Sequence, residues 1–197
     1  MAGYSGDHFI IRELQCLKAV NHDQFVAMVS YQDYIFALQS RLAQVVVFKA
    51  TTMELMRRVD IPNTRRMTLR GICIDEPNNK LYLCTTSRLL CVQLQSMLVL
   101  ESPDVDEIDV SSILESLEAF TGTLTADHFT GSLYMATSTT STGETTYSIV
   151  KLRPFFPKEH VRINLGVNIS HPFMALHTLS ESTTLAFSAI GEVVSIN

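Results

Sequence analysis

A short signature of an aspartate, a Leu-Tyr pair and a threonine occurs twice in the chain, and this repeat limits the possible folds more than any other feature. Its members are Asp75, Leu81, Tyr82 and Thr85 in the first copy and Asp127, Leu133, Tyr134 and Thr137 in the second. Each residue of the second copy lies 52 positions after its counterpart. In both copies turn-forming residues separate the aspartate from the Leu-Tyr pair, which predicts a strand, a turn and a second strand.

Weaker matches extend the repeat over most of the chain. The segment from Ser40 to Leu42 matches the segment from Ser87 to Leu89, 47 positions later, and a fourth copy covers residues 183–196. The units are approximately residues 25–61, 69–100, 120–165 and 173–197. A period near 50 residues with three or four strands per unit is typical of propeller blades. We therefore expect an all-β chain that folds as a single domain, a β-propeller-like array of about four antiparallel blades.

The repeat resembles the β-propeller superfamily, with blades nearest to the NHL, YWTD and WD types. The segments that carry the resemblance are Asp75 with Leu81-Tyr82-Leu83, Asp127 with Leu133-Tyr134-Met135, and Gln44-Val45-Val46-Val47-Phe48. The chain contains no tryptophan, so the Trp-Asp signature and the YWTD tetrapeptide are both absent, and no narrower family is assigned. We expect the Leu-Tyr strands to be the inner strands, stacked about the propeller axis.

Two segments depart from the repeat. Between the second and third units, apolar residues at the i, i+3, i+4, i+7 spacing (Val110, Ile113, Leu114, Leu117) predict one short inserted helix near residues 109–119. Ahead of the first unit, residues 9–17 predict a lone strand, while the last unit stops after its third strand. We expect this lone strand to complete the last blade and to remove two exposed sheet edges. The alternative is that the chain is a fragment or a subunit of a larger, shared propeller.

Charge and hydropathy argue against several classes of partner. The net charge is −5, so nucleic acid is not an expected partner. No apolar run reaches the ~18 residues of a membrane span and no secretory signal is visible, so we expect a cytoplasmic protein without membrane contact. The four cysteines (Cys16, Cys73, Cys84, Cys91) lack zinc-ligand spacing and are expected to be reduced and buried. The alternative, for an exported protein, is a disulfide between Cys84 and Cys91 across a tight turn.

A basic segment is the best candidate for partner binding. It contains Arg57, Arg58, Arg65, Arg66 and Arg70 within fourteen residues, in the expected connection between the first and second units. Connecting loops carry binding residues more often than strands do. Arginine clusters suit acidic or phosphorylated peptides, because the guanidinium group donates two parallel hydrogen bonds to an oxyanion.

Motifs for catalysis are missing from the sequence. There is no G-x-S-x-G elbow and no glycine-rich phosphate loop, and the six histidines are scattered. We therefore predict no catalytic residue, no metal ligand and no cofactor, and a non-catalytic scaffold that binds protein partners through propeller rim loops. Asp75 and Asp127 are interpreted as turn caps. If they instead hold a cation in a central channel, the chain is a metal-dependent propeller hydrolase or lactonase.

Overall fold

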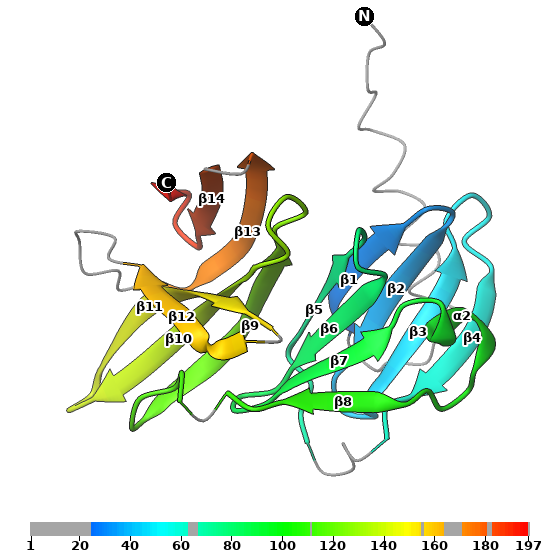
Figure 1. The fold of residues 1–197 in the computed structure, drawn as a ribbon, viewed down its shortest axis with the longest axis horizontal. Coiled ribbons are helices and arrows are strands. Elements are labelled where there is room, and N and C mark those ends of the chain that lie inside the picture. The colour runs from blue at the N-terminus through cyan, green and yellow to red at the C-terminus, as the bar shows by residue number, and fades with distance from the viewer. Residues whose placement is uncertain are drawn as a thin grey trace, which may run out of the picture.

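The computed structural model describes residues 25–62, 67–110, 112–154, 156–163, 171–180 and 183–196. The first two repeat units form two four-stranded antiparallel sheets (Figure 1). The first sheet contains β1 (Phe25–Tyr31), β2 (Tyr34–Gln39), β3 (Gln44–Lys49) and β4 (Leu55–Asp60). The second sheet contains β5 (Gly71–Asp75), β6 (Lys80–Cys84), β7 (Leu89–Gln93) and β8 (Val105–Ile108). The only helix in the described part of the chain, α2 (Ser96–Val99), connects β7 to β8.

The remaining units form a third and a fourth sheet. The third sheet contains β9 (Glu118–Ala126), β10 (Leu133–Ser141), β11 (Glu144–Arg153) and β12 (Phe156–Ile163). The fourth contains β13 (Phe173–Ser180), β14 (Thr183–Ser188) and β15 (Val193–Ile196), so its described residues supply three strands. The strand expected at residues 9–17 lies outside the described residues.

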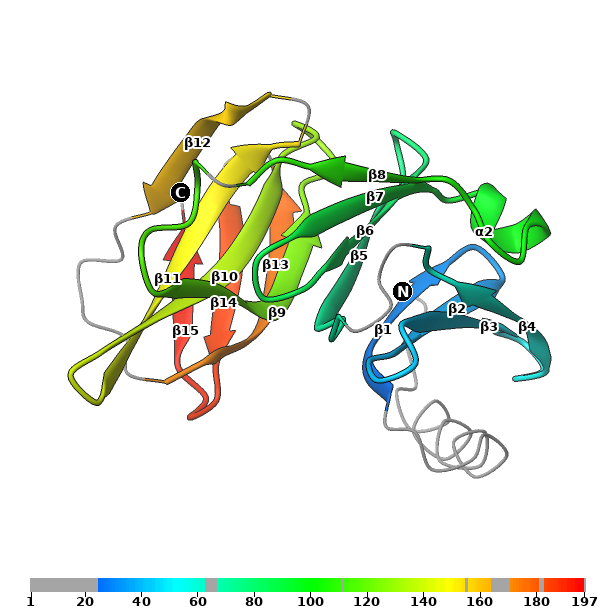
Figure 2. The same ribbon diagram turned by 90° about the horizontal axis from the view of Figure 1, so that it is seen from below.

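The four sheets are arranged as the blades of a four-bladed β-propeller (Figure 2). In each sheet the strands lie side by side in chain order, with the leading strand at one edge. The leading strands of successive sheets pack against one another, β1 against β5, β5 against β9 and β9 against β13. Among the described residues, β13 and β1 do not form a fourth junction of this kind. The expectations of an all-β chain and of four antiparallel blades are confirmed.

Strand β6 shows why a middle strand can be apolar on both of its faces. Leu81 and Leu83 point into the core between the first and second sheets. Tyr82 and Cys84, the alternate residues, point into the core between the second and third sheets. Because both faces of the blade are covered, no polar face is needed, and the usual alternation of apolar and polar residues disappears.

The expectation that the Leu-Tyr strands lie innermost is wrong. These residues begin β6 and β10, which are the second strands of their sheets, and the innermost positions belong to β1, β5, β9 and β13. Complete burial indicates a strand between two blades but does not indicate its distance from the axis. The burial of β1 alternates between half-buried and exposed residues, as expected for a strand that borders an open space.

The two repeated aspartates cap turns, as the sequence indicates. The buried carboxylate of Asp127 accepts hydrogen bonds from the backbone N–H groups of Phe129 (2.9 Å) and Thr130 (3.3 Å) and from the Thr130 hydroxyl. The buried carboxylate of Asp75 accepts one from the Asn78 amide at 2.8 Å. Both residues therefore fix the turn that precedes a Leu-Tyr strand.

Replacing this cap should destabilise the third blade. We expect Asp127→Ala to lower the free energy of unfolding by about 2–3 kcal/mol, because it leaves buried donors without an acceptor. Asp127→Asn keeps one acceptor oxygen, so its loss in the free energy of unfolding should be less than half that of Asp127→Ala. Urea unfolding followed by circular dichroism measures both values. An alanine variant within about 0.5 kcal/mol of the wild type would contradict the capping role.

The helix expected near residues 109–119 is not formed, and the short helix of the structure lies at α2 instead. Val110 and Ile113 are buried against the second and third sheets, so the apolar spacing reflects burial of a turn. Leu117 has a positive φ of 69°, which ends any right-handed helix at that residue. The described residues include no helix with the length and apolarity needed to cross a bilayer.

A buried carboxylate at this turn anchors the outer strand of the third blade. Glu118, whose side chain is 0% exposed, forms a two-pronged ion pair with Arg162 of β12 at 2.6 and 2.8 Å. Its carboxylate also accepts hydrogen bonds from the Thr137 hydroxyl (2.5 Å) and the Glu115 backbone N–H (3.0 Å). Burial opposes ionisation of Glu118, but these donors outweigh it and lower its pKa.

The cysteines of the second sheet are free thiols. Cys73, Cys84 and Cys91 are all buried and unpaired, whereas Cys16 lies outside the described residues. The alternative of a Cys84–Cys91 disulfide is wrong, because the register places Cys84 opposite Leu89 and Cys91 opposite Tyr82. The tight turn lies one residue earlier than expected, at Thr86 and Ser87 instead of Ser87 and Arg88, since the Thr85 N–H donates to the Arg88 carbonyl at 2.9 Å.

Candidate functional site: the inner-strand groove

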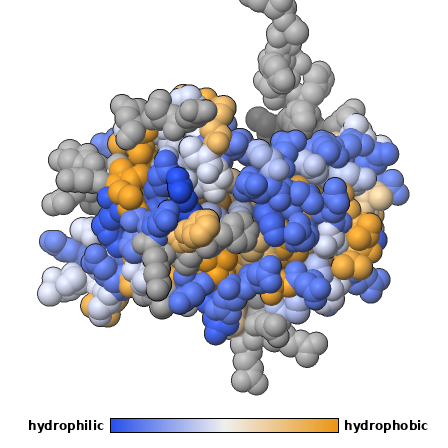
Figure 3. Space-filling view, viewed as in Figure 1, coloured by the Kyte–Doolittle hydropathy of each residue, from blue (hydrophilic) through white to orange (hydrophobic). Residues whose placement is uncertain are grey.

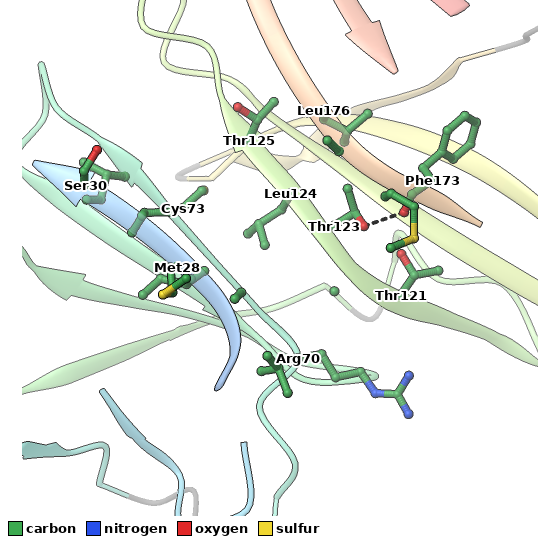
Figure 4. Close-up of a pocket in the computed structure, with 18 of the residues that line it drawn as sticks. Met28, Ser30, Arg70, Cys73, Thr121, Thr123, Leu124, Thr125, Phe173 and Leu176 are labelled. Carbon is green, nitrogen blue, oxygen red and sulfur yellow. Dashed lines mark hydrogen bonds between the residues drawn. The ribbon is translucent and has the colours of Figure 1, made fainter. Parts of the chain in front are cut away.

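The leading strands of the four blades line a groove of about 680 Å³. We call it the inner-strand groove (Figure 4). Its walls come from β1, β5, β9 and β13 and from residues next to these strands. The volume lies within the range of roughly 300–1,000 Å³ that is usual for binding pockets. The groove is therefore the candidate site that the fold itself creates.

Two glycines bring β5 and β9 together at the groove. A Cβ atom on Gly71 would lie 1.8 Å from the Gly122 carbonyl oxygen, and one on Gly122 would lie 2.6 Å from the Arg70 carbonyl oxygen. Gly122 also has a φ of 109°, which other residues rarely adopt. The backbones of the second and third blades can thus touch only where both residues lack a side chain.

A bulge in β9 directs the hydroxyl of Thr123 toward the fourth blade. The register between β9 and β10 shifts between Met135 and Thr137, so that residues 121–123 are displaced from regular pairing. The Thr123 hydroxyl donates to the Phe173 carbonyl at 2.6 Å, as the dashed line in Figure 4 shows. The Thr121 hydroxyl donates to the Ala136 carbonyl at 3.2 Å. The Thr123 bond holds β13 against β9 and fixes the width of the groove on that side, whereas the Thr121 bond stays within the third sheet.

The charged residues of the groove lie at opposite ends of β5. Arg70 immediately precedes the strand, and Glu76 immediately follows it. His128, which follows β9, lies in the lining as well. Of the described lining residues, Arg70 and Glu76 are the only arginine and the only carboxylate, and neither forms an ion pair with a described residue. The groove therefore has a cationic and an anionic end.

Apolar side chains stand exposed along two walls of the groove. Val26 and Met28 of β1 are 47% and 43% exposed, and Met174 of β13 is 67% exposed. A second exposed apolar surface lies on the propeller rim over α2 and β4, at the right of Figure 3. Its exposed residues are Leu55, Met56, Val99 and Leu100. The groove combines its apolar walls with the separated charges of Arg70 and Glu76.

The predicted partner-binding arginines are divided between these regions. Arg70 lines the groove. Arg57 and Arg58 lie within β4 rather than in a loop, and they point to opposite faces of the first sheet because neighbouring residues in a strand alternate. Arg65 and Arg66 lie outside the described residues. The described arginines thus do not form one patch.

The sequence did not indicate the other groove residues. Met28, Thr121, Glu76 and His128 belong to different repeat units or follow different strands, and none forms part of a motif. Gly122, between two threonines of a predicted strand, was an available signal, because an isolated glycine in a strand often marks a bulge or a close backbone approach.

The chemistry of the groove does not favour nucleophilic catalysis. Cys73 is the thiol in the lining, and burial raises its pKa well above the ordinary value, so the thiol stays protonated at neutral pH. Burial also raises the pKa of the nearby Cys84 thiol to about 12. Across the described residues, no group of three or more histidine, cysteine, aspartate or glutamate side chains is placed to hold a metal ion.

Solved structures with the same fold are propellers. The chain is similar to the β-propeller domain of Cps50 (Swd1) from Myceliophteria thermophila, with a TM-score of 0.57 and 12% sequence identity. The similarity covers 100% of this chain but 57% of that domain, so the chain spans little more than half its length. A quinonprotein alcohol dehydrogenase-like protein from Bacteroides thetaiotaomicron gives a TM-score of 0.51 at 17% identity, over 87% of this chain and 40% of that one. No protein-family model and no curated protein matches the sequence. By its blades and by these similarities, the chain has a β-propeller fold.

Proposed function

We propose that the chain is a non-catalytic protein-interaction module of the cytoplasm and that its inner-strand groove binds a segment of a partner protein. One observation carries the proposal: an arginine without an ion-pair partner among the described residues shares a groove with exposed Val26, Met28 and Met174. Exposed apolar surface beside a polar rim is typical of binding sites. The three buried free thiols support a reducing compartment.

The proposed partner is acidic or phosphorylated where it meets the chain. Arg70 offers two parallel donors to a carboxylate or a phosphate. The predicted partner-binding residues Arg58, Arg65 and Arg66 are proposed as a second contact, which the groove does not require. Neither nucleic acid nor a membrane surface is a proposed partner, because the net charge of −5 repels both.

Site-specific photo-cross-linking tests the proposal. With Met28→p-benzoylphenylalanine in the groove, we expect a cross-link to one partner, which mass spectrometry identifies and which then binds as a purified protein. Adding Arg70→Ser should lower the yield by about fivefold, because a charge pair at the edge of the interface is lost. The control places the same photoreactive residue at Leu117, an exposed position of the turn before β9.

Two results would overturn the groove proposal. One is an equal cross-link yield from Leu117 and from Met28. The other is a yield from Met28 that Arg70→Ser leaves unchanged. A triple variant, Arg58→Ser with Arg65→Ser and Arg66→Ser, tests the second contact separately. Loss of binding in that variant alone assigns the partner to these arginines instead of the groove.

The second candidate function is that of a subunit in a larger propeller. It is supported by the 57% coverage of the Cps50 (Swd1) propeller domain and by the missing junction between the described residues of β13 and β1. The last sheet supports it as well, because one of its two faces is covered by the third sheet and the other carries apolar residues that a further blade would cover. The residues on that second face are Leu185, Phe187 and Val193, and Val193 is 54% exposed. Light scattering with size-exclusion chromatography should then give a mass above the 22.0 kDa of one chain. A monomer that keeps its partner binding would exclude this candidate.

A further inference from the structure

We propose that the inner-strand groove recognises an extended peptide segment by the spacing of two opposite charges. An acidic residue of the peptide pairs with Arg70, and a basic residue six positions away in the peptide pairs with Glu76. This inference rests on the proposed function, and it specifies the chemistry of the segment that the groove binds. It follows from the placement of the charged residues at the two ends of β5 and from the nature of the surface between them.

Strand geometry sets the distance between the two charges. Arg70 and Glu76 flank the five residues of β5 and are six positions apart. An antiparallel strand rises about 3.4 Å per residue, so the two positions are separated by roughly 20 Å along the groove. Arg70 and Glu76 lie just outside the two ends of β5, and both residues line the groove.

A peptide in extended conformation has the same rise and the same alternation as β5. Two of its side chains can therefore face Arg70 and Glu76 together only when they are also six positions apart. Two peptide charges that are only two positions apart are separated by about 7 Å, so they can pair with Arg70 or with Glu76 but not with both at once. A peptide that is helical covers about 9 Å with six residues and also fails to reach both ends.

Between the two ends, the described lining residues include no further lysine, arginine, aspartate or glutamate. Met28 and Ile74 contribute apolar surface there, and Thr125 contributes a hydroxyl. The residues between the two charges of the peptide are therefore expected to be small, apolar or hydroxyl-bearing.

Fluorescence anisotropy with defined peptides tests the spacing. The matched probe is an acetylated and amidated seven-residue peptide with Asp at position 1, Lys at position 7 and Val, Ser and Ala between them. The mismatched probe has the same composition, with Asp and Lys at positions 3 and 5. We expect the matched probe to bind about fivefold more tightly, the size of effect that one additional, partly shielded charge pair supplies.

Charge reversal supplies the decisive comparison. Arg70→Glu should remove the preference for the matched probe, because both ends of the groove are then acidic. The double variant Arg70→Glu with Glu76→Arg should restore the preference, because the same peptide can lie in the opposite direction. Arg41→Glu is the matched control, since Arg41 is exposed, follows β2 and does not line the groove, and it should keep the wild-type preference.

Equal binding of the two probes, no binding of either probe, or failure of the folded double variant to restore the preference would each overturn the spacing rule. Circular dichroism melting shows whether each variant is folded. These outcomes are distinguishable from failure of the proposed function. If the cross-link from position 28 is still weakened by Arg70→Ser while the probes show no preference, the groove binds a partner but not by this spacing.

Discussion

Gly71→Ala is expected to lower the free energy of unfolding by about 3 kcal/mol or more, or to prevent folding altogether. The new Cβ would lie 1.8 Å from the backbone carbonyl oxygen of Gly122, and a backbone atom in a paired strand cannot move away as a flexible side chain can. To relieve the clash, β5 must separate from β9, which opens the junction between the second and third blades. Chemical unfolding measures the loss of stability. If the variant does not fold, a loss of soluble yield compared with the wild type is the readout.

Gly122→Ala should be similarly damaging, because it combines a contact of 2.6 Å to the Arg70 carbonyl oxygen with a φ of 109°. Gly143→Ala is the matched control. Gly143 also has a positive φ, 88°, but a Cβ there would meet nothing within 4 Å, so it should cost only about 1 kcal/mol of backbone strain. Equal losses at positions 122 and 143 would show that the backbones of the two blades do not touch at this point.

Arg162→Met is expected to lower the free energy of unfolding by about 2–4 kcal/mol at neutral pH. The substitution leaves Glu118 as a buried carboxylate without its ion-pair partner and frees β12 from the turn before β9. The exposed pair Arg153–Glu159, with both side chains about 60% exposed, supplies the control. Arg153→Met should change stability by about 0.5 kcal/mol or less. Equal effects of the two substitutions would contradict a special role for the buried pair.

The same ion pair makes stability depend on pH. The folded-state pKa of Glu118 lies below the value in the unfolded chain, so the unfolded state binds more protons in the acidic range. The contribution of Glu118 is therefore complete above its unfolded pKa, roughly 4.3, and is lost as the pH falls through the lower folded-state pKa. Glu118→Gln should flatten the acid limb of the stability curve. If the stability of the variant falls as steeply at low pH as that of the wild type, the pH dependence is due to other carboxylates.

The sequence indicated the strands and their grouping because both depend on local chemistry. Turn residues with a capping aspartate precede each Leu-Tyr strand, and that arrangement is found in the second and third blades. The radial order of the strands could not be read in the same way. A strand such as β6 is apolar on both sides because each side meets a neighbouring blade, and that composition is independent of its distance from the axis.

Long-range contacts account for the remaining errors. The apolar spacing of residues 110–117 indicated a helix, but Glu118 is drawn into β9 by Arg162, 44 positions away. Likewise, the groove joins Met28, Arg70, Thr121 and Phe173, which belong to four different repeat units. Each is unremarkable within its own unit, and only the packing of the leading strands brings them together.

The most direct test of the account is a methyl NMR spectrum of the chain labelled at its eight methionines, recorded with and without the purified partner identified by cross-linking. Met28 and Met174 line the groove, Met56 lies on the rim strand β4, and Met97 is buried. We expect binding to shift the signals of Met28 and Met174 and to leave those of Met56 and Met97 in place. Shifts at Met56 with unchanged signals from Met28 and Met174 would place the partner on the rim and contradict the groove as the binding site.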